Sequence, residues 1–268
     1  MKDFNQKVVV ITGAASGMGR AYALAFAKEG SRLALCDFDE QGLQETLTLA
    51  SSLTSEKMCT KVFDISNEQA TFEFASQVKT ELGNAHVVIN NAGIEGSAKP
   101  VWATDDNYFK RVMAVNYFGV VNGTRAFLPQ LQAESLGVIV NVSSIFGLVG
   151  TPNHADYCGS KFAVRGFTEA LMVELASSDI QVHLLHPGGI KTNIARQESS
   201  KAFSDHFLTT SADDVAQHLI MSIKNNKLRI IYGNSAMKTW LGTRLLSLKV
   251  LRKVLWNEMK TSIDLKDY

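Results

Sequence analysis

Residues 7–20 have the sequence Lys7-Val-Val-Val-Ile-Thr12-Gly13-Ala-Ala-Ser-Gly17-Met-Gly19-Arg20, and an alanine-rich segment follows. Four β-branched apolar residues in a row indicate a strand buried on both faces, which is typical of parallel sheets. The three glycines then permit a sharp turn and let backbone N–H groups approach a phosphate at the start of a helix. The stretch therefore predicts a strand, turn and helix that cradle a dinucleotide pyrophosphate. Its G-x-x-x-G-x-G spacing differs from the standard G-x-G-x-x-G fingerprint, so an ordinary glycine-rich turn is the alternative.

Apolar, β-rich runs alternate with helical stretches along the rest of the chain. Such strands between helices predict a parallel sheet covered on both faces, and right-handed crossovers make it doubly wound. The predicted fold class is α/β and Rossmann-like. We expect strands at residues 8–11, 32–36, 57–63, 86–90, 138–142, 181–185 and 229–232, and helices beginning near Gly17, Asp39, Asn67, Thr104, Asp156 and Ala212.

Length and composition set limits on the protein class. A chain of 268 residues with 46% hydrophobic and 20% charged residues can bury one large core, so we expect one dinucleotide-binding and catalytic domain at residues 1–234 and a helical extension at 235–268. A net charge of +1 gives no reason to expect nucleic-acid binding. The three cysteines have no metal-ligand spacing, which indicates reduced, buried thiols and no metal site. The glycine turn begins too early to leave room for a signal peptide, so a cytoplasmic location is expected.

Tyr157-Cys-Gly-Ser-Lys161 is the strongest candidate for chemistry. Residues four apart on a helix lie on one face, so the lysine ammonium stands beside the phenol. A free tyrosine has a pKa of about 10, and a nearby positive charge lowers it toward the range useful for an acid-base catalyst. Tyrosine and lysine are also common on helix surfaces, so the pattern needs support from other motifs.

That support comes from further motifs placed in order along the chain. Together with the glycine turn and Tyr157-x-x-x-Lys161, they resemble the short-chain dehydrogenase/reductase family in its short, single-domain branch, and the resemblance runs nearly end to end. It implies a seven-stranded sheet with the strand order 3-2-1-4-5-6-7. The motifs are Asn90-Asn91-Ala92-Gly93 after an apolar strand, Asn116 on a helix, Val142-Ser143-Ser144 at the end of a strand, and Pro187-Gly188-x-x-x-Thr192.

The resemblance implies four catalytic residues. Tyr157 would exchange a proton with the substrate oxygen, and Lys161 would lower the Tyr157 pKa and hold the nicotinamide ribose. Ser144 would hydrogen-bond the substrate oxygen, with a helix cap as its alternative role. Asn116 would hold a water that links Lys161 to solvent, with a satisfied buried amide as the alternative. His154 and His186 are expected to be structural or to line the pocket.

NAD is the expected cofactor. Asp37 follows the second strand, where it can accept hydrogen bonds from the adenine ribose, although it could instead cap the next helix. The extra phosphate of NADP would meet the Asp37 carboxylate, at a cost on the order of 4 kcal/mol for each unit charge pair, and Arg20 is the nearest basic side chain. NADP is therefore less favoured. The expected cofactor contacts are Gly13, Ser16, Gly17, Met18, Gly19, Asp37, Asp64, Ile65, Asn91, Ala92, Gly93, Tyr157, Lys161, Ile190 and Thr192.

The expected substrate is an apolar secondary alcohol or ketone, because the residues expected around it are largely apolar. The same residues could instead be core or a subunit contact, and a homo-oligomer, dimer or tetramer, is expected. Two other functions stay open: an NADPH-dependent 3-oxoacyl or sterol-type ketone reductase, and a non-catalytic dinucleotide-binding module with a membrane- or partner-binding C-terminus. The expected pocket residues are Ile94, Trp102, Ile145, Phe146, Leu148, Val149, Phe203, Phe207 and Leu208, with residues 195–211 as a mobile lid.

The extension at 235–268 has the pattern of an amphipathic helix. Leu241, Leu245, Leu248, Leu251, Leu255 and Met259 recur at steps of three and four, which predicts one apolar helix face. Basic residues interrupt each apolar run well before the roughly 20 residues needed to span a bilayer. Such a helix can pack over the pocket or a neighbouring subunit, or lie on an anionic membrane surface. Packing is favoured, because it is the commoner fate of such faces.

Overall fold

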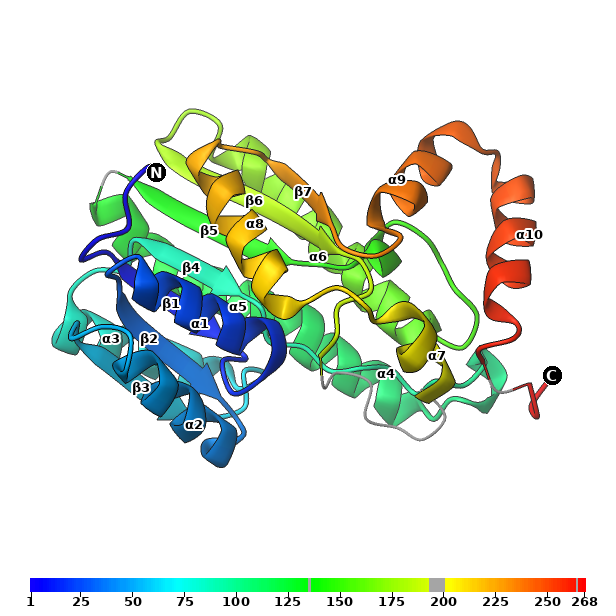
Figure 1. Ribbon diagram of the computed structural model, residues 1–268, viewed down its shortest axis with the longest axis horizontal. Helices are drawn as coiled ribbons and strands as arrows, with labels where there is room; N and C mark the ends of the chain where they lie inside the picture. Colours follow the sequence, from blue (N-terminus) through cyan, green and yellow to red (C-terminus); the bar gives the residue numbers. More distant parts are fainter. Residues whose placement is uncertain (135, 193–200, 264) are drawn as a thin grey trace.

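The computed structural model describes residues 1–134, 136–192, 201–263 and 265–268, and shows a seven-stranded sheet with helices on both faces (Figure 1). The strand order is β3-β2-β1-β4-β5-β6-β7 and each neighbouring pair is parallel, which confirms the predicted topology. The strands are β1 (Val8–Thr12), β2 (Arg32–Asp37), β3 (Met58–Val62), β4 (Val87–Asn90), β5 (Gly137–Val142), β6 (Ile180–Pro187) and β7 (Arg229–Tyr232).

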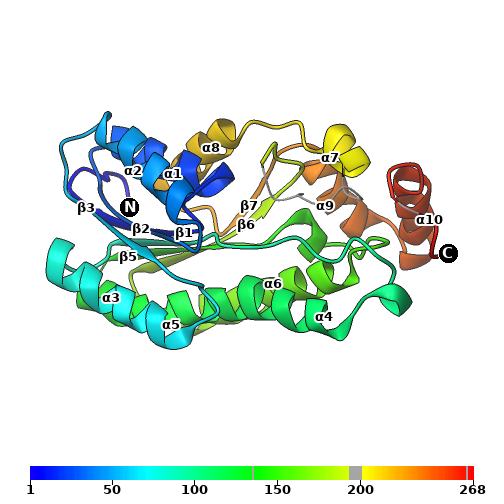
Figure 2. The same ribbon diagram turned by 90° about the horizontal axis from the view of Figure 1, so that it is seen from below.

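Helices form one layer on each face of the sheet (Figure 2). The layer with α1, α2 and α8 covers one face, and that with α3, α4, α5 and α6 covers the other. Strand β1 is buried by both, since Val9 and Ile11 belong to one apolar core and Val8 and Val10 to the other. These helices are α1 (Gly17–Lys28), α2 (Glu40–Ser51), α3 (Glu68–Leu82), α4 (Asp106–Met113), α5 (Gly119–Ala133), α6 (Ala155–Glu174) and α8 (Ala212–Lys224).

Local chemistry explains where several of these helices begin. Asp39 and Asn67 cap α2 and α3, because their side chains accept hydrogen bonds from the N–H groups of Gly42 and Ala70. The helix predicted near Thr104 is more complex than expected. It runs through α4, one π-helical turn at Ala114–Phe118 and then α5. Such turns often occur at functional sites, and this one holds Asn116.

The C-terminal extension folds as two helices, and the prediction of one continuous helix is wrong. Helices α9 (Ala236–Leu245) and α10 (Leu248–Met259) are separated by Leu246 and Ser247, both with extended backbone. The two helices and α7 (Lys201–Phe207) lie beyond the carboxyl ends of β6 and β7 (Figure 1). The bend splits the predicted apolar face, so that Leu245 and Leu248 are 76% and 81% exposed. Among the described residues, no helix is both long and apolar enough to cross a membrane.

Candidate active site

The glycine turn after β1 has the tight geometry that the sequence predicts. Gly13 and Gly17 have φ angles of +69° and +53°. A Cβ atom on Gly13 would lie 2.7 Å from the Cα of Ala92, and one on Gly19 would lie 1.9 Å from the Gly13 carbonyl oxygen. The Asn91 amide closes the turn from β4 by donating to the carbonyls of Thr12 and Gly13. Only glycine fits this cradle, which suits close backbone contact with a phosphate.

Asp37 lies at the end of β2 beside this turn. Its two carboxylate oxygens accept hydrogen bonds from the backbone N–H groups of Ala15 (2.9 Å) and Asp39 (3.0 Å). The residue that caps α2 is Asp39, so capping does not explain Asp37. The Arg20 guanidinium donates to the carbonyls of Ala15 and Gly42 and to the side chains of Glu45 and Thr46, so its described hydrogen bonds do not include Asp37.

Asp64 and Ile65 follow β3 and line a cleft that the glycine turn and Asp37 also border. We call it the cofactor cleft. The Asp64 carboxylate accepts hydrogen bonds from the side chain of Arg111 (2.6 Å) and from Ser66. Burial favours a higher pKa for Asp64, but the hydrogen bonds from Arg111 and Ser66 outweigh it and leave the pKa below its ordinary value. The sequence analysis missed Arg111. No local pattern marks Arg111, because its partner Asp64 lies 47 residues away in the sequence.

Tyr157 and Lys161 lie one turn apart on α6. Both line a second cleft. The Lys161 Nζ atom lies 5.6 Å from the centre of the Tyr157 ring and donates to the Val142 carbonyl (3.1 Å). The Tyr157 hydroxyl hydrogen-bonds the Ser144 side chain. Ser144 also caps the short helix at Ile145–Gly147 by accepting from the Phe146 N–H, which is its alternative role, and its contact with a substrate oxygen stays a prediction.

Burial dominates the acid-base properties of this pair. It lowers the pKa of Lys161 to about 8. It raises the pKa of Tyr157, and the hydrogen bond with Ser144 offsets only part of that effect. The net pKa of Tyr157 in the cofactor-free protein is therefore above its ordinary value, and the lowering of this pKa by Lys161 stays a prediction. The reason is desolvation, which disfavours the charged form of both groups.

Asn116 is fully buried behind Lys161. Its side-chain oxygen accepts from the Ile94 N–H (2.8 Å), and its amide nitrogen donates to the Ile94 carbonyl and the Ser160 hydroxyl. A Cβ atom on Gly93 would lie 3.2 Å from Asn116 Oδ1 and 3.4 Å from Lys161 Nζ, so the two groups lie close together. The amide is satisfied by protein groups, and the water relay stays a prediction.

The two histidines have structural contacts. His186 hydrogen-bonds the Ser144 carbonyl (2.8 Å), and burial lowers its pKa to about 4. His154 contacts the Pro152 carbonyl and packs against Phe146 at the cleft wall, and burial lowers its pKa as well. Both imidazoles are therefore neutral at pH 7.

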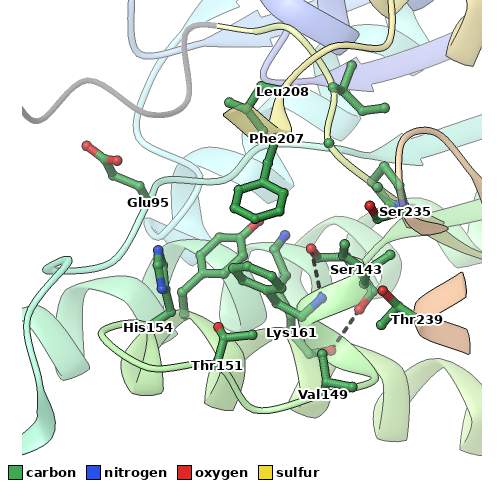
Figure 3. A pocket seen from close by; sticks show the side chains of 18 of the residues that line it. Glu95, Ser143, Val149, Thr151, His154, Lys161, Phe207, Leu208, Ser235 and Thr239 are labelled. Atoms are coloured by element: carbon green, nitrogen blue, oxygen red, sulfur yellow. Dashed lines mark hydrogen bonds between the residues drawn. The ribbon is translucent and has the colours of Figure 1, made fainter. Parts of the chain in front are cut away.

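The second cleft contains about 1300 Å³ of empty space, part of it open to solvent. Glu95 and His154 lie on one side of it, and Ser235 and Thr239 on the other (Figure 3). The wall includes the expected Ile145, Phe146, Val149, Phe207 and Leu208, together with Ile190 and Thr192 from the loop after β6.

Other expected wall residues lie elsewhere. Ile94 lines the cofactor cleft, and Leu148 is buried outside the wall. Trp102 is 69% exposed and packs edge-on against Tyr268. Its indole N–H donates to the Asp267 carbonyl. The Phe203 side chain and part of the expected lid, residues 195–200, lie outside the described residues.

The C-terminal helices supply wall residues that the sequence analysis did not assign. Leu255, Glu258 and Met259 of α10 and Thr239 of α9 line the cleft. Met259 is only 4% exposed and belongs to an apolar cluster with Phe146 and Cys158. The extension therefore packs over the cleft that contains Tyr157.

Comparisons with known proteins agree with this geometry. Residues 7–203 match the family model described as short chain dehydrogenase. A Mycobacterium tuberculosis protein named SadH is 39% identical over 251 residues, covering 88% of this chain and 89% of that one. Cyclopentanol dehydrogenase of Comamonas testosteroni is 38% identical over 194 residues, covering 72% and 76%. A crystal structure of a short-chain dehydrogenase/reductase from Burkholderia phymatum in complex with NAD superimposes with a TM-score of 0.82 at 28% identity, covering 97% and 96%. The chain belongs to the short-chain dehydrogenase/reductase family of oxidoreductases.

Proposed function

We propose that this protein is an NAD-dependent oxidoreductase that interconverts an apolar secondary alcohol and its ketone. The observation that carries the proposal is the continuity of the two clefts. Met18, Gly93 and Thr192 line both of them, so a dinucleotide on the glycine turn would reach the cleft that contains Tyr157.

The residues present fit a dinucleotide. Gly13, Gly17 and Gly19 leave room for a pyrophosphate at the start of α1, and no acidic residue stands in the first turn of that helix. Asp37 would accept hydrogen bonds from the adenine ribose, and its charge disfavours a ribose phosphate. When bound, the nicotinamide supplies the acceptor or donor of a hydride.

Tyr157 and Ser144 handle the substrate oxygen in this proposal. The two hydroxyl groups lie beside each other, so a substrate oxygen bound next to them would contact both. In reduction, the Tyr157 hydroxyl would give its proton to the developing alkoxide. In oxidation, the phenolate would take the proton of the alcohol. Because burial raises the Tyr157 pKa, the oxidation rate should increase with pH.

The positive charge of Lys161 would support this proton exchange. At pH 7 its ammonium is protonated in most molecules, since its pKa is about 8, and it stabilises the nearby phenolate. Asn116 lies close to Lys161, and we propose that it helps to pass a proton toward solvent.

The cleft wall favours an apolar substrate body. Five apolar residues line the cleft around the reacting end of a substrate: Ile145, Phe146, Val149, Leu255 and Met259. Burying an apolar side chain of similar size contributes about 1.5–3 kcal/mol, so each well-filled part of the wall discriminates between substrates.

A homo-oligomer is part of the proposal. Tyr108 and Phe118 of the α4–α5 segment are 46% and 52% exposed, and Phe162 and Val173 of α6 are 41% and 76% exposed. Helices α4 and α6 contact each other, so these exposed apolar side chains lie on one side of the sheet. A second copy of the chain is the partner we propose for this side.

The test is a panel of secondary alcohols of graded chain length, each offered with NAD and with NADP, with the reduced nicotinamide followed by absorbance. We expect kcat/KM to increase with the apolar area of the alcohol and to be about a hundredfold higher with NAD. Failure to oxidise any alcohol or reduce any ketone, while NAD still binds, would support the non-catalytic alternative.

A further inference from the structure

The bend between α9 and α10 exposes an unusual run of apolar residues. All residues from Arg244 to Val250 are exposed. Four of them are apolar, and we call them the apolar bend: Leu245 (76% exposed), Leu246 (40%), Leu248 (81%) and Val250 (44%). In Figure 1 the two helices form a hairpin that projects from the sheet, with this bend at its outer end. Exposed leucines this close together on a projecting tip are typical of an interaction surface.

Positive charge surrounds the apolar bend. Arg244, Lys249, Arg252 and Lys253 are all exposed, and residues 235–257 contain no Asp or Glu. Within the described part of the chain, none of these four forms an ion pair, although Arg244 lies over the Trp240 ring. The nearby Lys238 differs, because it pairs with Glu258. We call the four residues the basic set.

The same hairpin borders the substrate cleft. Leu255 and Met259 line that cleft from the inner side of α10, whereas Leu248 begins the helix at the apolar bend. At 1.5 Å per helical residue, Leu248 and Leu255 are about 10 Å apart along α10. A surface bound to the bend would therefore lie close to the cleft.

We propose that the apolar bend and the basic set form a docking surface for a membrane that contains anionic phospholipids. The leucines would enter the boundary between headgroups and acyl chains, and the basic set would bind the anionic headgroups. A second copy of the chain fits this surface less well. A symmetric contact through the bend would bring two identical basic sets together, and like charges repel.

The test is cosedimentation of the full chain with vesicles. We expect binding to vesicles of phosphatidylcholine and phosphatidylserine at low salt, weaker binding at high salt, and little binding to phosphatidylcholine alone. Reversing Lys249, Arg252 and Lys253 to Glu should weaken binding at least a hundredfold, since each basic residue near such a surface contributes about 1 kcal/mol. Leu245→Ser with Leu248→Ser should weaken it about tenfold.

Matched control variants separate docking from general charge and folding effects. Lys28→Glu, Lys57→Glu and Lys79→Glu together make the same change in net charge at exposed sites on α1, before β3 and on α3. Met221→Ser removes an exposed apolar group on α8, on the other face of the sheet, where Met221 is 59% exposed. Both controls should bind vesicles like the wild type, and all variants should keep wild-type kcat on a water-soluble alcohol.

Three results would overturn the proposal. One is no binding of the wild-type protein to phosphatidylserine vesicles at low salt. Another is equal loss of binding in the controls. The last is an absence of vesicle binding combined with dissociation of a dimer by the Leu245/Leu248 variant in sedimentation velocity, which would assign the bend to a second copy. None of these bears on the proposed reaction, which the alcohol panel tests separately.

Discussion

The doubly wound sheet and the C-terminal hairpin contribute to the same cleft in different ways. The sheet side supplies Ser144 and Lys161, which are buried, and Tyr157, which is partly buried. Hydrogen bonds with the Phe146 N–H and the Val142 carbonyl hold the side chains of Ser144 and Lys161. The hairpin supplies Leu255 and Met259, while its outer side is largely exposed. This difference suggests that the sheet fixes the chemistry and the hairpin selects the substrate. Each prediction below tests that division, from the largest expected effect to the smallest.

Tyr157→Phe should reduce kcat by about a thousandfold, because the phenol is the proposed proton carrier and such groups contribute 10²- to 10⁴-fold. Dinucleotide affinity should change little, since the phosphates would be held at Gly13 and Gly17. Steady-state kinetics and calorimetric titration with NAD measure the two effects. Tyr108→Phe, at an exposed site on α4, is the control. Retention of more than a few per cent of the wild-type rate would mean that another group transfers the proton.

Lys161→Met should change how stability depends on pH. In the cofactor-free folded protein the Lys161 pKa is about 8, below its ordinary value of 10.5, so the unfolded chain binds more protons between these values. Stability therefore rises with pH across this window, by on the order of 3 kcal/mol for this group. The variant should lack that rise.

Urea unfolding of both proteins at pH 7 and near pH 10.5 measures this contribution. The raised pKa values of Tyr22 and the buried cysteines affect wild type and variant alike, so the difference between the two proteins isolates Lys161. Identical pH dependence in both would show that Lys161 is not desolvated.

Asp37→Ser should reduce the preference for NAD over NADP from about a hundredfold to less than tenfold, because the repulsion of a ribose phosphate disappears. The KM for the alcohol should stay unchanged, since Asp37 lines the cofactor cleft and not the described wall of the cleft that contains Tyr157. The ratio of kcat/KM values for the two cofactors measures it. Parity of NAD and NADP in the wild type would already contradict the role of Asp37.

Met259→Ala should raise the KM for an apolar alcohol about tenfold and change kcat less than twofold. Met259 is buried against Phe146 and Cys158, and its removal opens the cleft wall without touching the proton carriers. Leu248→Ala, at a position that is 81% exposed, is the control on the same helix. A fall in kcat without a change in KM would assign the hairpin a part in the chemistry.

Tyr268→Phe should raise KM about threefold. The Tyr268 hydroxyl donates to Asn153 Oδ1 (3.0 Å), four residues before Tyr157, and its ring packs on Trp102 and Trp256. Losing one neutral hydrogen bond typically costs about 0.5–1.5 kcal/mol. Wild-type KM values over the whole alcohol panel would show that this contact does not hold the hairpin in place.

The sequence predicted the sheet side well for physical reasons. Buried parallel strands are continuous apolar runs, and the turn after β1 requires glycine at Gly13 and Gly19, so both leave local signals. Burial raises the pKa of Tyr157, and sequence spacing alone could not predict that effect because burial depends on the whole fold. Arg111 and Trp102 were missed or misplaced for a similar reason, since their partners Asp64 and Asp267 are distant in sequence.

The hairpin was harder to predict. Leucines at steps of three and four fit one long helix as well as two short ones. The bend contains no Pro or Gly, and Ser247, a residue type that often begins helices, makes no side-chain cap. Met259 packs against Phe146 and Cys158, and periodicity contains no information on such tertiary contacts.

The Asn91 contact also has a consequence for the time order of folding. This amide fixes the glycine turn from 79 residues away in sequence, and the central strand β4 that precedes it pairs with β1. A nascent chain that has completed β1 and α1 therefore still lacks a finished phosphate cradle. Loop closure over that span is slow, and the cofactor can bind only after it. Bound dinucleotide should accordingly slow unfolding while leaving the rate of refolding nearly unchanged.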